Sequence, residues 1–219
     1  MKNNTFKLII ISILFLLTNN LFPNNNSFVV TADNRSNTTQ YEYALKEINN
    51  LTFNPQPALP YPSFFVSCGD FDPVQTNYTI YNDTTLYPNL PPFYLAVGNH
   101  EYENSSYMNY IKNVIIPNSP NIVNYGPLCS FSFDNNNIHS IVINQYANND
   151  EGELDSIIQE WVQEDISQTE KDNIFIFTHE PAFPRNRHQG DSMDQFADSR
   201  DKFWDILRND PTSQFTKKN

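Results

Sequence analysis

Four short apolar runs recur along the chain, and each is followed directly by a polar residue of a type that can bind a metal ion. Residues 28–32 precede Asp33, residues 64–69 precede Asp70, residues 93–98 precede Asn99, and residues 174–178 precede His179. Nearly continuous apolar runs of this length are typical of strands that are buried on both faces. The pattern therefore predicts four buried strands, each ending at one polar side chain.

Between these runs, apolar residues recur at helical spacing. Apolar stripes within residues 41–48, 154–166 and 193–207 predict three amphipathic helices. Ser192 and Gln195 have the spacing of a capping box at the start of the third helix.

The remaining segments predict a hairpin and two loops. Residues 129–133 and 138–144 flank an Asn-rich tetrapeptide, which is typical of a β-hairpin. The Pro- and Asn-rich segments 52–62 and 75–92 are predicted to be long surface loops. The resulting order, strand–helix–strand–strand–helix–hairpin–helix–strand–helix, predicts an α/β protein built in layers.

The four polar residues at the strand ends are candidates for one functional site. Ligands of α/β proteins bind beyond the carboxyl ends of the strands, so these side chains are expected at the same edge. Carboxylate, amide and imidazole groups together suit Mg, Mn, Fe or Zn. A single such residue could merely cap its element. Four in four strands, two of them directly after a glycine, favour a metal site.

Three motifs resemble those of the calcineurin-like metallophosphoesterases in order and spacing. They are Cys68-Gly69-Asp70, Gly98-Asn99-His100-Glu101 and Thr178-His179-Glu180-Pro181. The resemblance covers roughly residues 28–208. It implies a four-layer αββα sandwich in which two mixed sheets pack face to face between helices. It also implies two divalent metal ions (Mn, Fe, Zn or Mg) that activate a water molecule and hold the oxygens of a phosphate mono- or diester.

The same resemblance assigns roles to individual residues. Asp33 would bind the first metal, Asp70 would bridge both metals, and Asn99 and His179 would bind the second. His100 would protonate the leaving oxygen or stabilise charge on the phosphoryl group. The alternative for His100 is a histidine that starts a helix or faces solvent.

Two positions near these motifs depart from the family pattern. The family's first motif is usually D-x-H, but this chain has Arg35 in place of the histidine. Arg35 has no lone pair for a metal, although it could hold a substrate phosphate; a plain surface arginine is the alternative. The family often has an Asp three residues after the bridging Asp to orient the histidine. Here that position is Pro73, and Asp72 or Glu101 could substitute for it.

A third departure is the absence of the family's closing G-H-x-H motif before Asn219. We therefore expect the fold to be C-terminally incomplete, with the second metal site as the one better formed. Two hypotheses follow. The first is a metal-dependent phosphoesterase, and the second is a catalytically impaired fragment or pseudoenzyme that keeps the fold and at most one metal.

The two other histidines have different expected roles. His188 follows the fourth strand in a loop at the predicted site edge, so it is a candidate for binding substrate. A solvated loop is the simpler interpretation of that segment. His139 lies in a predicted hairpin strand and is expected to be structural.

Composition and missing motifs exclude several other functions. The chain has 25 acidic and 13 basic residues and a formal net charge of -12, which argues against non-specific binding of nucleic acid. It contains no GxSxG, GxGxxG or GxxxxGK[ST] motif, which argues against a serine hydrolase elbow or a nucleotide-phosphate loop. A small phosphoester is therefore the expected partner, and no oligomeric state is predicted.

The N-terminus has the pattern of a targeting segment. Lys2 and Lys7 precede the apolar run 8–17, which is too short for a comfortable membrane span. We predict a signal peptide or N-terminal anchor in residues 1–24, a truncated metallophosphoesterase domain in residues 28–210, and a polar tail in residues 211–219. The protein is expected to be secreted or anchored on the outer face of a membrane, in contact with the membrane only through the N-terminal segment.

Overall fold

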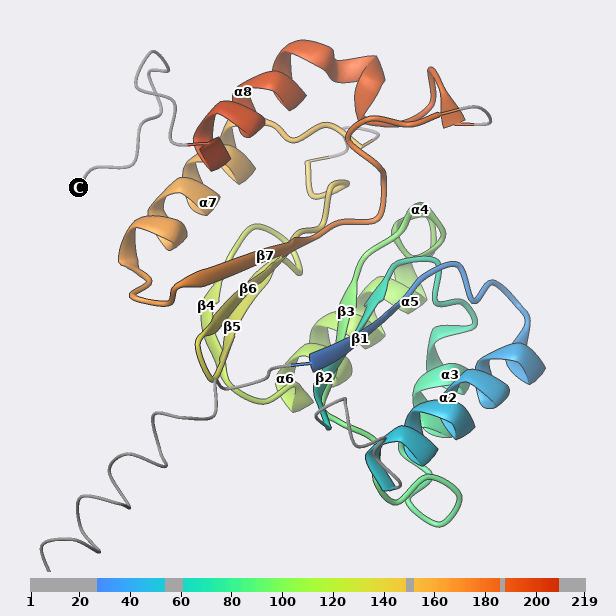
Figure 1. Ribbon diagram of the computed structural model, residues 1–219. Coiled ribbons are helices and arrows are strands. Elements are labelled where there is room, and N and C mark those ends of the chain that lie inside the picture. Colours follow the sequence, from blue (N-terminus) through green and yellow to red (C-terminus); the bar gives the residue numbers. More distant parts are fainter. Residues whose placement is uncertain (1–26, 54–60, 149–151, 186–187, 209–219) are drawn as a thin grey trace, which may run out of the picture.

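The computed structural model describes residues 27–53, 61–148, 152–185 and 188–208, and within them two β-sheets pack face to face (Figure 1). The first sheet is parallel, in the order β1 (Ser27–Thr31), β2 (Pro62–Cys68), β3 (Phe93–Ala96). The second has the order β4 (Ile122–Tyr125), β5 (Phe131–Asn135), β6 (Ile138–Val142), β7 (Asn173–Phe177). In it β5 is antiparallel to β4 and β6, whereas β7 is parallel to β6.

Helices form the two outer layers of the molecule. Those on the first sheet are α2 (Thr38–Phe53), α3 (Val74–Tyr81), α4 (Asn99–Tyr102), α5 (Ser105–Tyr110), the π-helix η1 (Ile111–Ile115) and α6 (Ile116–Asn118). Those on the second are α7 (Ser156–Gln168), the 3-10 helix η3 (Met193–Phe196) and α8 (Ala197–Arg208). Figure 1 shows α2 and α3 on one side of the paired sheets and α7 and α8 on the other. The predicted αββα sandwich is confirmed.

The strand predictions need two corrections. The expectation of two mixed sheets is wrong for the first sheet, because helical crossovers return its described strands in the same direction. The expectation of four strands buried on both faces holds for β2 and β3 only. Val30 in β1 is 48% exposed and Phe175 in β7 is 38% exposed, and both strands lie at an edge of their described sheet. The strand β3, also at an edge, is buried throughout.

Aromatic side chains join the two sheets. The ring of Phe133 in β5 stacks on Tyr94 in β3, with centroids 3.5 Å apart, and meets Phe64 in β2 edge-on at 5.1 Å. At the sheet edges, Phe28 in β1 meets Phe175 in β7 at 4.9 Å. Large buried rings contribute strongly to core stability, so these contacts fix how the two sheets are placed relative to each other.

The predicted hairpin is confirmed as β5 and β6, but two other predictions are wrong. Segment 75–92 is not wholly a loop, because Val74, Asn77 and Tyr78 form a buried face on α3. The polar Asn77 concealed this face in the sequence; its side-chain amide donates to the carbonyl of Phe71 at 2.9 Å. No capping box forms at Ser192, since its side chain makes no cap bond and a 3-10 helix starts there.

Three predictions concern residues outside this description. The signal peptide or anchor in residues 1–24 and the polar tail in residues 211–219 both lie outside the described residues, as does most of the predicted loop 52–62. Among the described helices, none is long and apolar enough to cross a membrane.

His139 is structural, as expected, and lies in a buried charge network. Its Nδ1 is 2.8 Å from Asp134 and its Nε2 is 2.7 Å from Asp165, which also accepts bonds from Asn124 and Ser132. An imidazole that donates from both nitrogens to carboxylates is positively charged. The network ties α7, which contains Asp165, to the hairpin.

We expect this network to make stability depend on pH. Burial acts to lower the pKa of His139, but the bonds to Asp165 and Asp134 outweigh it and raise the pKa above 6.5. Stability from His139 is therefore complete below pH 6.5 and is lost as pH rises through the raised pKa. For Asp165, burial acts to raise the pKa, but its hydrogen bonds lower it below 3.8, so its contribution is lost as pH falls through that lowered value.

Urea unfolding at a series of pH values tests this expectation. The urea concentration at the midpoint of unfolding of the native chain should fall as pH rises through the raised pKa of His139. His139→Gln should remove that fall, because glutamine does not titrate. Parallel pH curves for the two proteins would contradict the assignment.

Candidate metal centre

Two of the predicted site residues lie where the chain turns sharply after a strand. Asp33 follows β1 with φ 56° and Asp70 follows β2 with φ 51°, both in the left-handed region that non-glycine residues rarely adopt. Backbone bonds hold the two turns together: Asp33 N donates to the Gly69 carbonyl and Arg35 N to the Asp70 carbonyl, each at 3.1 Å. Strained conformations of this kind cluster at functional sites.

Two glycines allow the strand ends to approach each other. A Cβ on Gly69, which has φ +83°, would lie 2.6 Å from Nδ1 of His179. A Cβ on Gly98 would lie 2.5 Å from the backbone nitrogen of Asp70. Any side chain at either position would push the candidate ligands apart.

Glu101 connects the ends of β2 and β3 beneath the site. Its carboxylate accepts bonds from three backbone nitrogens: Asp70 at 2.8 Å, Phe71 at 2.7 Å and Gly98 at 2.8 Å. The residue is fully buried. Burial raises the pKa of Glu101, and the bonds from Gly98 and Phe71 oppose the shift. The side chain thus fixes the backbone that positions Asp70.

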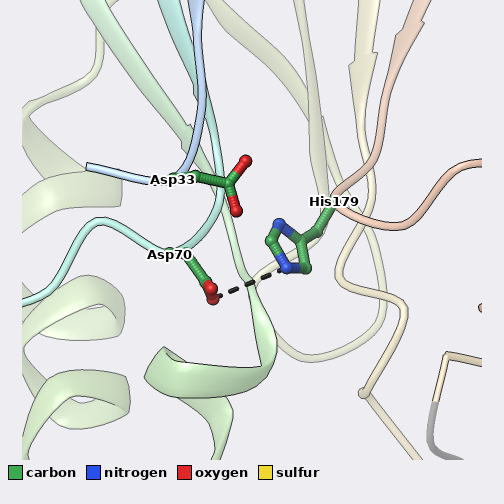
Figure 2. Close-up of side chains that lie close together, drawn as sticks. All are labelled: Asp33, Asp70 and His179. Carbon is green, nitrogen blue, oxygen red and sulfur yellow. Dashed lines mark ion pairs between the residues drawn. The ribbon is translucent and has the colours of Figure 1, made fainter. Parts of the chain in front are cut away.

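Asp33, Asp70 and His179 come together from three strand ends (Figure 2). One potential ligand atom from each lies within 4.8 Å of the other two, and Asp70 is only 3% exposed. Nδ1 of His179 is 2.8 Å from the Cys68 carbonyl, to which it can only donate, so in a neutral ring Nε2 is the nitrogen that has the lone pair. Nε2 lies 3.5 Å from Asp70 Oδ1. Two carboxylates and an imidazole held by a backbone carbonyl suit a divalent cation.

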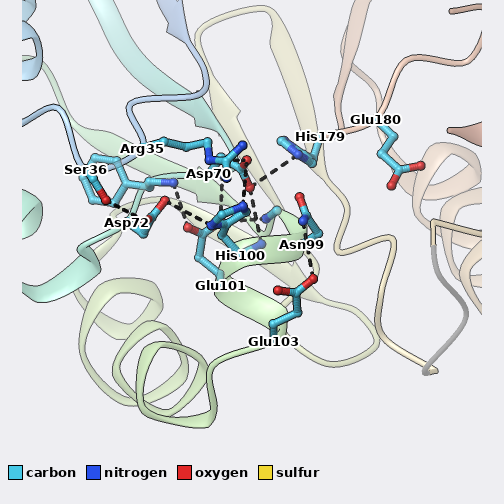
Figure 3. A network of polar contacts seen from close by, with 12 residues as sticks. Arg35, Ser36, Asp70, Asp72, Asn99, His100, Glu101, Glu103, His179 and Glu180 are labelled. Carbon is cyan, nitrogen blue, oxygen red and sulfur yellow. Dashed lines mark hydrogen bonds and ion pairs between the residues drawn. The ribbon is translucent and has the colours of Figure 1, made fainter. Parts of the chain in front are cut away.

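Asn99 and His100 lie beside this group on α4 (Figure 3). The side-chain nitrogen of Asn99 is 3.5 Å from Glu103, which leaves its oxygen for another partner. Nε2 of His100 is 3.9 Å from Asp70 Oδ2 and its Nδ1 is 3.7 Å from Asp72 Oδ1. Of the two candidate partners for His100, the structure places Asp72 beside the ring.

Arg35 also contacts the buried carboxylate. Its Nε is 3.6 Å from Asp70 Oδ2, while its side chain is 50% exposed. The structure therefore places the guanidinium against the carboxylate that the sequence assigns to metal binding, and the residue is not merely on the surface.

These residues line a cleft of about 940 Å³. Six of the seven predicted site residues contribute to its wall: Asp33, Arg35, Asp70, Asn99, His179 and His188. His100 is not among the lining residues, although its side chain is 28% exposed and its Nε2 is 3.9 Å from Asp70 Oδ2. His188 is half exposed and lies 3.5 Å from Asp191, which lines the same cleft.

Sequence reasoning missed an aromatic and acidic wall of the cleft. The hydroxyl of Tyr146 donates to Glu180 Oε1 at 2.8 Å, and its ring stacks on Tyr102 with centroids 5.6 Å apart. Burial raises the pKa of Glu180, although the bond from Tyr146 opposes the shift. Glu180 could have been found from its place next to His179, but no motif marks Tyr146, which follows the hairpin.

The family model for calcineurin-like phosphoesterases matches residues 27–208, which is most of the chain. No curated protein matches the sequence at a significant level.

Proposed function

The chain belongs to the calcineurin-like phosphoesterase family, and from this premise we propose that it hydrolyses a phosphate mono- or diester with the help of divalent metal at Asp33, Asp70 and His179. The convergence of these three potential ligands within 4.8 Å is the observation that carries the proposal. Asn99, in the same cleft, would add its side-chain oxygen as a further ligand.

Each remaining site residue has a role that fits its position. A bound divalent cation supplies Lewis acidity, which activates water and neutralises charge on phosphoryl oxygens. Arg35 lines the cleft, where its guanidinium would bind a phosphoryl oxygen. His188, which also lines the cleft, would bind the substrate. His100 would donate a proton to the leaving oxygen, held in orientation by Asp72.

The second candidate function is a phosphoesterase-like protein with impaired catalysis. The contact between Arg35 and Asp70 favours it, because a guanidinium cannot serve as the ligand that the family has at this position.

Export of the protein, either secreted or anchored on an outer membrane face, remains part of the proposal and rests on residues 1–24.

The proposal is tested by hydrolysis of p-nitrophenyl phosphate and bis(p-nitrophenyl) phosphate by metal-stripped protein, before and after Mn²⁺ is added. Hydrolysis of either ester that requires Mn²⁺ supports an enzyme, and the preferred ester identifies the class. Mn²⁺ binding without hydrolysis of either supports the impaired protein.

His100→Asn is expected to lower kcat by about 10²–10⁴-fold, the usual contribution of general acid–base catalysis. The loss should be larger for phenyl phosphate than for p-nitrophenyl phosphate, because phenolate leaves poorly without a proton. Mn²⁺ affinity should be almost unchanged. His188→Asn provides the comparison and should raise KM more than it lowers kcat. Equal losses on both esters would exclude proton donation by His100.

A further inference from the structure

The two oxygens of Asp70 face different partners. Oδ1 is 3.5 Å from Nε2 of His179, on the side of the candidate metal ligands. Oδ2 is 3.6 Å from Nε of Arg35. A carboxylate can bridge two metal ions through both oxygens or through one, but here a cationic side chain already lies against the oxygen that faces away from His179.

The position of Arg35 is built into the backbone. Its amide nitrogen donates to the Asp70 carbonyl at 3.1 Å, and the next residue, Ser36, donates from its backbone to Asp72 at 2.8 Å. Residues 35 and 36 are thereby bonded to the turn that contains Asp70. The backbone of Arg35 is therefore fixed next to Asp70, and its guanidinium lies against the carboxylate as a consequence of the fold.

The candidate ligands on the other side suit a single ion. Asp33, Asp70 and His179 form the one group of three acidic, histidine or cysteine ligands found within the described part of the chain. One ion with metal–ligand distances of about 2.0–2.2 Å can hold ligand atoms that lie up to about 4.4 Å apart. The three candidate ligand atoms lie within 4.8 Å of one another, which is close to that separation. Asp33, which the family resemblance assigns to a first metal, is thus close enough to share one ion with His179.

We propose that this site takes one divalent metal ion, held by Asp33, Asp70 and His179, and that the guanidinium of Arg35 is the fixed positive charge on the other side of Asp70. The inference rests on the proposed function and specifies its metal requirement. Arginine keeps its charge and has no lone pair, so it repels a second cation and cannot bind it. It can still neutralise Asp70 and bind a phosphoryl oxygen.

Counting bound Mn²⁺ in Arg35→His tests the inference without relying on activity. This substitution removes the charge and adds an imidazole two residues after Asp33. Calorimetric titration should show one Mn²⁺ per native chain and two per Arg35→His chain. Electron paramagnetic resonance should show an isolated ion in the native protein and a coupled pair in the variant. Arg208→His, the same substitution at an exposed position on α8, should keep one Mn²⁺.

The outcomes separate this inference from the proposed function. Two coupled ions in the native protein, or no bound ion, would overturn it whatever the activity, as would a folded Arg35→His chain that still binds one. Circular dichroism shows whether the Arg35→His chain is folded. If it is not, the number of Mn²⁺ ions bound by the native chain tests the inference by itself. One ion in a native protein that hydrolyses no phosphoester would leave the inference standing and refute the proposed function.

Discussion

Replacing Asp70 by asparagine is expected to lower metal-dependent hydrolysis by about 10³-fold or more, since the several kcal/mol supplied by metal-ion catalysis would be lost. The side chain is nearly fully buried and contacts Arg35, His100 and His179. An asparagine amide keeps the shape of the carboxylate but not its charge. The change should therefore remove bound metal while the fold survives.

Steady-state kinetics and Mn²⁺ titration of the same preparation measure this loss. Asp191→Asn is the matched control, because Asp191 is another carboxylate of the same cleft but lies outside the group of three candidate ligands. It should lose less than about tenfold in kcat/KM, equivalent to about 1.4 kcal/mol. Similar losses in both variants would show that the cleft's overall charge matters more than the ligand role of Asp70.

Glu101→Ala should give the largest loss of stability at the site, about 3 kcal/mol or more in the free energy of unfolding. The substitution leaves the backbone N–H groups of Asp70, Phe71 and Gly98 without their acceptor, and each unsatisfied buried donor costs about 1–3 kcal/mol. Metal affinity should also fall by about 10–100-fold, the usual effect of losing a side chain that orients a ligand.

A graded pair of variants makes this prediction specific. In Glu101→Gln the side-chain carbonyl oxygen can still accept hydrogen bonds from the backbone N–H groups of Asp70 and Gly98. The amide nitrogen would face the N–H of Phe71, from which it cannot accept a hydrogen bond. Its loss of stability in urea unfolding should therefore lie between those of the native protein and Glu101→Ala. Glu103→Ala, two residues along on the exposed side, should change stability by less than about 0.5 kcal/mol. Equal stability of all four proteins would show that Glu101 does not hold the strand ends.

The strand ends of the site could be predicted from the sequence because their signals are local. A continuous apolar run followed by a polar residue identifies both the strand and the edge at which its side chain lies. Asp33, Asp70, Asn99 and His179 were all found in this way, and all four line one cleft. The structural role expected for His139 rested on the same kind of local evidence, its place in a hairpin strand.

The supporting contacts could not be predicted, because they join residues distant in sequence. Glu101 bonds to backbone groups 30 and 31 residues before it, and no pattern within a strand or helix encodes such a contact. The bond from Tyr146 to Glu180 spans 34 residues. Helix α3 was missed for a different reason: one of the three residues on its buried face is the polar Asn77.

A stepwise addition of Mn²⁺ to metal-free protein tests metal-dependent hydrolysis most directly, with bound Mn²⁺ and the rate of phenyl phosphate hydrolysis both measured at each step. We predict that the rate rises in proportion to bound Mn²⁺ and reaches its plateau when the site is full. A full site with no hydrolysis above the metal-only background, or an undiminished rate in the metal-free protein, would contradict the assignment of this cleft as a metal-dependent phosphoesterase.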